Sequence, residues 1–139
     1  MKEPIDYLRD RGVGALAEKM GIKFTEYTIE RSRAEMPAEG NTQPLGLVHG
    51  GAYVVLGESL GSMTAALYAQ TVLGAGYHPV GIEINASHSG SATSGTVYGE
   101  CTPIHLGKTL TVHQIRITDE NDRLLSTIRI TNLIKSPRK

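Results

Sequence analysis

Residues 43–62 read QPLGLVHGGAYVVLGESLGS, and this stretch decides the fold of the 139-residue chain. From residue 49 to about residue 69 the sequence contains no proline and is apolar nearly all round, which is typical of a buried helix. Such a helix has to be covered by other elements or by a partner chain. Glu58 is the one acidic residue inside the stretch. Because ionised carboxylates are rarely buried alone, this residue needs either a partner or a function.

The segments that follow and precede this helix predict a sheet around it. Residues 22–36 alternate polar and apolar side chains and are interpreted as one strand with one wetted face. The second half of the chain predicts four more strands, with a hairpin between the last two, over residues 80–86, 96–104, 110–118 and 124–134. Turn compositions separate these strands (SGSATSG, HLGK and DEND), and such short connections favour antiparallel pairing.

The two ends of the chain are expected to be simple. Apolar residues at roughly helical spacing over residues 4–20 predict an N-terminal amphipathic helix that stops at Gly21. Residues 136–139, SPRK, are expected to form a solvated basic tail. The whole chain, 1–139, is expected to form a single domain of the α+β class, in which a five-stranded antiparallel sheet wraps a long central helix.

Composition excludes several classes of function. Fourteen basic residues balance fourteen acidic ones, so no net field favours nucleic acid or an anionic membrane. No segment approaches the roughly 20 apolar residues of a membrane span, and the charged beginning lacks the apolar core of a secretory signal. A cytoplasmic location is therefore expected. The single cysteine, Cys101, is interpreted as a small buried strand residue, and no histidine or cysteine spacing predicts a metal site.

The sequence GESLG, residues 57–61, matches the nucleophile elbow of serine hydrolases. That motif needs a strained turn between a strand and a helix, whereas here it falls inside a helix. A nucleophilic Ser59 is therefore disfavoured. Gly57 and Gly61 are better interpreted as a bare helix face that allows another backbone to approach, and a helix of a second subunit is one hypothesis for that contact.

The helix begins at His49-Gly50-Gly51, and its first amides have no partner within the helix. They carry the positive end of the helix dipole, so the segment either binds an oxyanion or phosphate or simply makes a tight turn. His49 and Glu58 are nine residues apart, which is about two and a half turns and about 13 Å along the axis. They face opposite sides of the helix. If both act in one reaction, the site has to combine two subunits of a symmetric dimer.

These residues carry a family resemblance. The order QPLGLVHGGAYVVLGESLGS, VGIEINASHSGSA and CTPIHLGKTLTVHQIRITDENDRLLSTIRIT resembles the hotdog-fold acyl-CoA thioesterases of the phenylacetate-pathway type. Within them it is most similar to hydrolases of 1,4-dihydroxy-2-naphthoyl-CoA and other aryl-CoA thioesters. The resemblance covers about residues 15–134, and its most specific part is the pattern Q-P-x-G-x-x-H-G-G followed, after six residues, by glutamate. It implies the hotdog fold, in which an antiparallel sheet wraps a central helix.

The resemblance also implies roles for the catalytic residues. Glu58 would be the catalytic carboxylate, acting as a nucleophile or as a general base on water. Gly50 would donate its backbone N–H to the thioester oxygen. Gln43 and His49 would position the acyl group and the attacking or leaving atoms.

Substrate-binding residues follow from the resemblance in the same way. Ser62 corresponds to a serine near the catalytic carboxylate, and Met63 would line the pocket. Close relatives carry a basic residue shortly after the histidine of NASH, where this chain has Gly90. The coenzyme A phosphates are therefore expected to be held differently, with help from Lys108, and His88 and Lys108 are further candidate substrate-binding residues.

The expected activity is hydrolysis of an aromatic or hydroxyaryl acyl-CoA, with no metal and no cofactor beyond the coenzyme A of the substrate. The resemblance implies a homodimer that shares its active sites, commonly paired into a homotetramer. Two alternatives within the fold remain open, a non-catalytic module that binds acyl-CoA and a broad-range thioesterase for medium-chain or hydroxyacyl-CoA. A hotdog hydratase or dehydratase is disfavoured, because no paired Asp and His occur at a suitable spacing.

Overall fold

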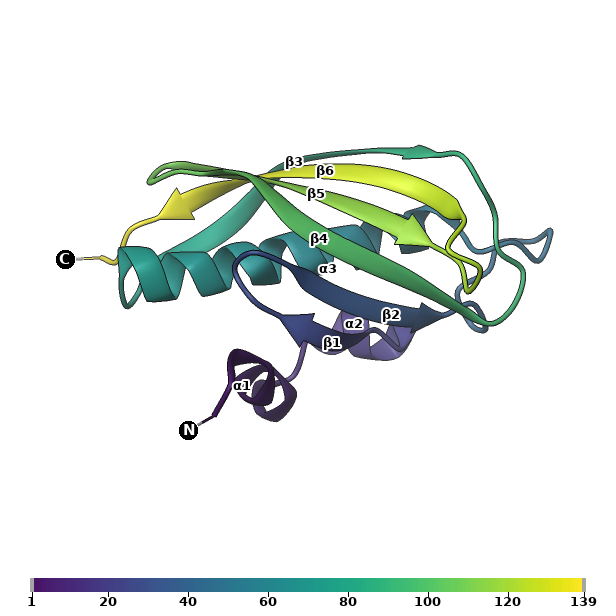
Figure 1. Cartoon of the computed structure of the whole chain (residues 1–139), viewed down its shortest axis with the longest axis horizontal. Helices are drawn as coiled ribbons and strands as arrows, with labels where there is room; N and C mark the ends of the chain where they lie inside the picture. Colours follow the sequence, from purple (N-terminus) through teal and green to yellow (C-terminus); the bar gives the residue numbers. More distant parts are fainter. Residues whose placement is uncertain (1, 139) are drawn as a thin grey trace.

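A computed structural model describes residues 2–138 and shows one helix wrapped by one antiparallel sheet. Helix α3 spans Gly50–Tyr68 and continues into a π-helical turn, η1, over Ala69–Leu73. The sheet order is β1-β2-β4-β5-β6-β3, and every neighbouring pair is antiparallel. Figure 1 shows the sheet arching over α3. The strands are β1 Lys23–Tyr27, β2 Ser32–Pro37, β3 His78–His88, β4 Thr96–Leu106, β5 Leu110–Thr118 and β6 Leu124–Lys135.

The predicted fold class is confirmed: the chain has the hotdog architecture, with α3 at its centre and strands in the predicted order. Leu56 and Leu60 of α3 are fully buried against the inner face of the sheet, where Ile115 and Ile128 are also fully buried. Side chains of alternating positions in β5 and β6 point to this face, so one face of the sheet forms the core.

Gly57 and Gly61 serve the contact between α3 and its own sheet. A β-carbon added to Gly57 would lie 2.7 Å from Cδ1 of Ile128, and one added to Gly61 would lie 2.3 Å from Cγ2 of Ile130. Both glycines are buried. The hypothesis that they mediate contact between helices of two subunits is therefore wrong, because the space beside them is already filled by β6.

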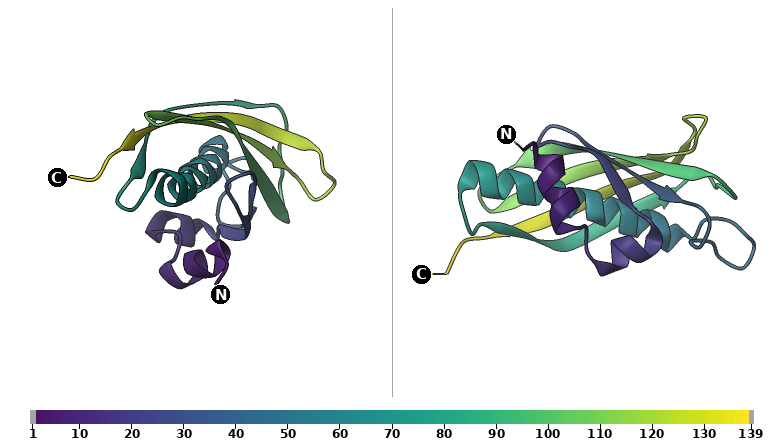
Figure 2. Two further views of the ribbon diagram at one scale, coloured as in Figure 1. Left: turned by 60° about the vertical axis from the view of Figure 1, so that its left-hand side comes forward. Right: turned by 90° about the horizontal axis from the view of Figure 1, so that it is seen from below.

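The N-terminal segment forms two helices instead of the single helix predicted over residues 4–20. Helix α1 spans Pro4–Arg11 and α2 spans Ala15–Met20. Gly12 and Gly14, between them, have φ angles of 88° and 95°, which continue no right-handed helix. Figure 2 shows α3 lying between the arched sheet and these two helices.

The strand predicted over residues 22–36 is a hairpin of two strands, β1 and β2, which gives the sheet six strands rather than five. The turn is closed at Thr28, whose N–H donates to the carbonyl of Arg31 at 3.1 Å. The Thr28 hydroxyl donates to the same carbonyl. Alternation of polar and apolar residues continues across this turn, so the period alone does not reveal it.

The remaining predicted strands are present: β5 has the predicted bounds, and β3, β4 and β6 are longer than expected. The predicted β5–β6 hairpin is confirmed, and its turn is organised by Asp119, whose Oδ1 accepts the N–H groups of Asn121 and Arg123 at 2.9 Å. The backbone N–H of Arg123 is the main cause that lowers the pKa of Asp119. In the predicted tail, residues 136–138 are exposed, and Lys139 lies outside the described residues. No helix within residues 2–138 is long and apolar enough to cross a membrane.

Candidate active site

The first turn of α3 offers a backbone amide with no acceptor. His49 caps the helix: its Nδ1 accepts the N–H of Gly51 at 2.8 Å, and its carbonyl accepts the N–H of Ala52 at 2.9 Å. The N–H of Gly50 has no acceptor among residues 2–138. Because it lies at the positive end of the helix dipole, this N–H is suited to a developing negative charge.

The ring of His88, at the end of β3, covers Gly50. A β-carbon on Gly50 would lie 2.9 Å from both Cδ2 and Nε2 of His88. The ring is held from behind, since its Nδ1 lies 2.8 Å from the hydroxyl of the buried Ser126, and it packs on Tyr53 with ring centroids 5.4 Å apart. The structure therefore brings together His49, Gly50 and His88, which the sequence places on two separate elements.

Gln43 lies in the loop that leads into α3. Its backbone N–H donates to the carbonyl of Leu47 at 2.8 Å, and its carbonyl accepts the N–H of Gly46 at 2.9 Å. Its side-chain Oε1 accepts the N–H of Leu45. The loop is thus a tight turn closed by Gln43 itself, and the side-chain amide nitrogen is the group left to face a ligand.

Glu58 lies on the third turn of α3 and points toward β3. A β-carbon on Gly81 would lie 3.0 Å from its Oε2, so the absence of a side chain at residue 81 makes room for the carboxylate. Glu58 is exposed, and it forms no ion pair with any residue in the described part of the chain. Strand β3 is an edge of the sheet, so the carboxylate stands beside an open strand edge.

Ser62 and Met63 follow Glu58 on α3 but face different surroundings. Ser62 is half-buried, and its hydroxyl lies 3.5 Å from Oδ1 of Asn132 on β6, on the same side of α3 as Glu58. Met63 lines a cavity of about 250 Å³ under α1, together with Tyr27 and Leu67. The structure therefore places Ser62 near the candidate carboxylate and Met63 on the side of the helix that α1 covers.

The two further substrate-binding candidates, His88 and Lys108, lie at opposite ends of α3. His88 is beside Gly50, where the helix starts. Lys108 is exposed in the turn between β4 and β5, next to Gly107, whose carbonyl accepts the hydroxyl of Tyr68 at 3.0 Å, where α3 ends. One chain does not bring them together, and their common role remains a prediction.

Two other groups were considered as reactive centres. Cys101 is fully buried, as predicted, and burial raises the pKa of its thiol to about 12, which leaves no thiolate at neutral pH. Ser59 lies within the unbroken helix α3, so the strained elbow of a serine hydrolase is absent there. Across residues 2–138, no cluster of three His, Cys, Asp or Glu side chains is arranged to hold a metal.

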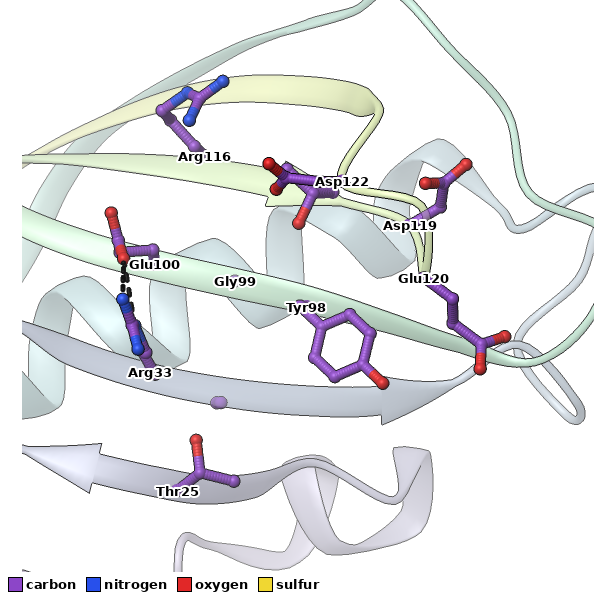
Figure 3. A pocket seen from close by; sticks show the side chains of 11 residues that line it. Thr25, Arg33, Tyr98, Gly99, Glu100, Arg116, Asp119, Glu120 and Asp122 are labelled. Atoms are coloured by element: carbon purple, nitrogen blue, oxygen red, sulfur yellow. Dashed lines mark hydrogen bonds and ion pairs between the residues drawn. The ribbon is translucent and has the colours of Figure 1, made fainter.

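A hollow of about 350 Å³ lies on the face of the sheet turned away from α3 (Figure 3). Charged side chains of both signs line it, and Arg33 pairs with Glu100 at 2.8 Å within it. Tyr98 and Arg116 border the same hollow. Because it contains neither Glu58 nor the start of α3, it is not the candidate active site.

Sequence reasoning missed several residues of the site. Gly81 carried a usable signal, because a glycine inside a strand often marks close approach of another group. Ser126, Tyr53 and Asn132 carried none, since each is an ordinary strand or helix residue until the pairing of β3 with β6 is known.

Comparison with known proteins gives the family. Residues 45–126, which contain α3 and strands β3, β4 and β5, match the thioesterase superfamily. The chain belongs to this superfamily and is an enzyme of the thioester hydrolase class.

The similar proteins include two named enzymes. The chain is 40% identical to the 1,4-dihydroxy-2-naphthoyl-CoA hydrolase of Escherichia coli over 134 residues, which cover 96% of each protein. It is 38% identical over 131 residues to the proofreading thioesterase EntH of Cronobacter turicensis, covering 94% of this chain and 93% of that protein. Among solved structures, thioesterase HI1161 of Haemophilus influenzae has a TM-score of 0.89 and 30% identity, covering 100% of this chain and 95% of the other.

Proposed function

We propose that this thioesterase hydrolyses an aromatic or hydroxyaryl acyl-CoA to the free acid and coenzyme A. The observation that carries the mechanism is the free N–H of Gly50 at the start of α3. The same helix has a single carboxylate, Glu58, which lies beside the open edge strand β3. The amide binds the thioester oxygen, and Glu58 attacks the carbonyl carbon or activates a water for that attack.

The Gly50 amide acts on the oxyanion. As the tetrahedral intermediate forms, the thioester oxygen gains negative charge, and a preorganised N–H donor stabilises that charge more than it stabilises the ground state. One such donor is worth about 3 to 4 kcal/mol in enzymes where it has been removed. The helix dipole adds to the same effect.

His49 and Gln43 act as positioning residues in this proposal. Because Nδ1 of His49 accepts a hydrogen bond from Gly51, the ring proton resides on Nε2, which is free to donate to the substrate or the leaving sulfur. The amide nitrogen of Gln43 offers a second donor from the loop before the helix. Together they orient the thioester between the oxyanion donor and the attacking group.

The geometry of β3 supports a site shared by two subunits. Within one chain, Gly50 contacts His88 at the end of β3, while Glu58 contacts Gly81 near its start. Because of the bulge between Gly81 and Glu83, these contacts are six steps apart in the ladder with β6, and their midpoint is Asn85. A long open edge strand is a template for pairing. If β3 pairs with its copy about a two-fold axis at this midpoint, Glu58 faces the partner's Gly50.

The nature of the acyl group rests on the relatives. The 40% identical protein is named a hydrolase of an aromatic acyl-CoA, which supports an aromatic substrate here. A second relative is named a proofreading thioesterase, a name that specifies no acyl group. A broad-range thioesterase for medium-chain or hydroxyacyl-CoA remains the alternative. For the coenzyme A phosphates we propose His88, with Lys108 of the other subunit as the second candidate. A homotetramer, formed from two such dimers, remains part of the proposal.

The decisive experiment measures thiol release from a panel of aryl-, hydroxyacyl- and fatty-acyl-CoA thioesters. Wild type is compared with Glu58→Ala and with Ser59→Ala as the matched control in the same helix. We expect Glu58→Ala to abolish turnover and Ser59→Ala to retain it. Full activity of Glu58→Ala, or loss in Ser59→Ala alone, would contradict the mechanism.

The shared site is tested by mixing two inactive variants, Glu58→Ala and Gly50→Pro. A heterodimer contains one intact site if each site takes Glu58 from one chain and Gly50 from the other. Recovery of activity in the mixture is therefore expected. If confirmed heterodimers stay inactive, the two residues act within one chain.

A further inference from the structure

Asn132, on β6, is fully buried but has an unpaired end. Its Oδ1 lies 3.5 Å from the hydroxyl of Ser62, whereas its Nδ2 has no acceptor within residues 2–138. Buried polar groups in folded proteins are nearly always hydrogen-bonded. An unpaired amide nitrogen at this position therefore indicates that an acceptor belongs nearby.

The space beside Asn132 is shared with the Glu58 carboxylate. Asn132 is paired with Gly81 across the β3–β6 ladder. The position of a β-carbon on Gly81 is 3.0 Å from Oε2 of Glu58 and 3.6 Å from Oδ1 of Asn132. The carboxylate and the amide thus border the same small space, and Ser62, one helical turn after Glu58, borders the amide from α3.

Within that space the amide presents its oxygen on the side of the carboxylate oxygen, although two acceptors do not bond to each other. A half-turn of the amide about its Cβ–Cγ bond exchanges the oxygen for the NH₂ group. In that orientation Nδ2 takes the place 3.5 Å from the hydroxyl of Ser62 and faces the space that the carboxylate of Glu58 borders. The nitrogen then has an acceptor at Ser62, and its second N–H is available to the carboxylate.

We propose that Asn132 is a positioning residue that donates an N–H to the carboxylate of Glu58. The inference rests on the proposed function and identifies what fixes the catalytic group. Other donors are lacking: Glu58 has no ion-pair partner among the described residues, and the side-chain amide of Asn85 on β3 already donates to Glu83 at 3.2 Å. Held by Asn132, the carboxylate stays extended beside β3, where a partner subunit would deliver the substrate.

The test compares Asn132→Val with Asn132→Thr. These side chains have the same shape and suit a strand, but only threonine keeps a hydroxyl donor. With an aryl-CoA substrate, we expect kcat of Asn132→Val to fall at least about tenfold, with KM within about twofold of wild type. The kcat of Asn132→Thr is expected to be at least about threefold higher than that of Asn132→Val. The matched control is Thr111→Val, which removes a fully buried hydroxyl that also lacks a partner within residues 2–138, at the cross-strand neighbour of Asn132.

The outcomes separate the two proposals. If wild type hydrolyses no CoA thioester, or Glu58→Ala remains fully active, the proposed function fails. If wild type is active, Glu58→Ala is inactive and Asn132→Val keeps the kcat of wild type, the role of Asn132 alone is overturned. Equal kcat for the valine and threonine variants also overturns it. Thermal unfolding of each variant accompanies the kinetics, and Asn132→Leu, whose side chain branches at the same carbon as that of asparagine, replaces the valine variant if that protein does not fold.

Discussion

The ring of His88 lies directly over Gly50, so closely that a β-carbon at residue 50 would be 2.9 Å from two of its atoms. The contact joins the end of β3 to the start of α3. Ser126 holds the far side of the ring at 2.8 Å, so the ring has a rigid support and cannot retreat freely. The glycine therefore keeps both the amide at the helix start and the imidazole within reach of one ligand.

Gly50→Ala is predicted to reduce thioester hydrolysis about 100-fold, a loss comparable to that of one oxyanion donor. Gly50 does not have a positive φ angle, so alanine is compatible with its backbone and the fold should persist. The loss arises because the new methyl group displaces either the His88 ring or the first turn of α3. Measurement of kcat/KM together with thermal unfolding separates this loss from instability.

A double-mutant cycle with His88→Ala tests the cause. When the ring is absent, the methyl group at residue 50 meets no obstacle, so Gly50→Ala should cost much less in the His88→Ala background than in wild type. An equal cost in both backgrounds would show that the ring does not mediate the effect.

Gly81→Ala is predicted to lower kcat roughly 10-fold to 100-fold while leaving stability nearly unchanged. Its β-carbon would lie 3.0 Å from Oε2 of Glu58, the mobile end of a flexible side chain, so the carboxylate moves and the fold does not. Gly81→Ala is compared with wild type by steady-state kinetics and urea unfolding. Wild-type turnover in this variant would show that Glu58 does not act from this position.

The central helix and most strands could be predicted because their signals are local. An apolar run of helical length specifies α3, and alternation bounded by turn residues specifies β4, β5 and β6. The β1–β2 hairpin was missed because its turn rests on hydrogen bonds of Thr28, an ordinary strand residue. The break between α1 and α2 was missed because the positive φ angles of Gly12 and Gly14 are not visible in sequence.

The candidate site also contains residues that local sequence reveals and contacts that it does not. Glu58 and Gly50 were identifiable from residue type, as a lone carboxylate and a glycine at a helix start. The supporting contacts of His88 with Ser126 and of Ser62 with Asn132 depend on how α3 lies on the β3–β6 pair. Residues that meet only through the register of two strands leave no spacing along the chain by which to find them.

Gly61→Ala is predicted to destabilise the protein by about 1 to 3 kcal/mol, the usual cost of overpacking, in spite of the better helix propensity of alanine. The new β-carbon would lie 2.3 Å from Cγ2 of Ile130, a methyl group fixed close to the β6 backbone. Urea unfolding measures the loss. In an Ile130→Ala background the same substitution fills a cavity and should be neutral or stabilising, whereas an unchanged cost would contradict the packing explanation.

The burial of His113 predicts that the free energy of unfolding decreases as pH falls from 7 to 5. It is fully buried on β5 with both ring nitrogens unpaired, and burial lowers its pKa from 6.5 to about 4. The folded state therefore binds this proton less readily than the unfolded state does. The stability that comes from keeping His113 neutral is fully present above pH 6.5 and is lost progressively as pH falls through about 4. Over the interval from pH 7 to 5 the expected loss is about 2 kcal/mol.

The measurement is the free energy of unfolding in urea at pH 7 and pH 5, at one protein concentration because an oligomer's stability depends on it. His113→Leu removes the titrating group and should flatten the pH dependence over this interval. The carboxylate of Asp119 does not interfere, since the pKa of this group is lowered and it titrates below the interval. If His113→Leu loses as much stability as wild type between the two pH values, another group is responsible for the pH dependence.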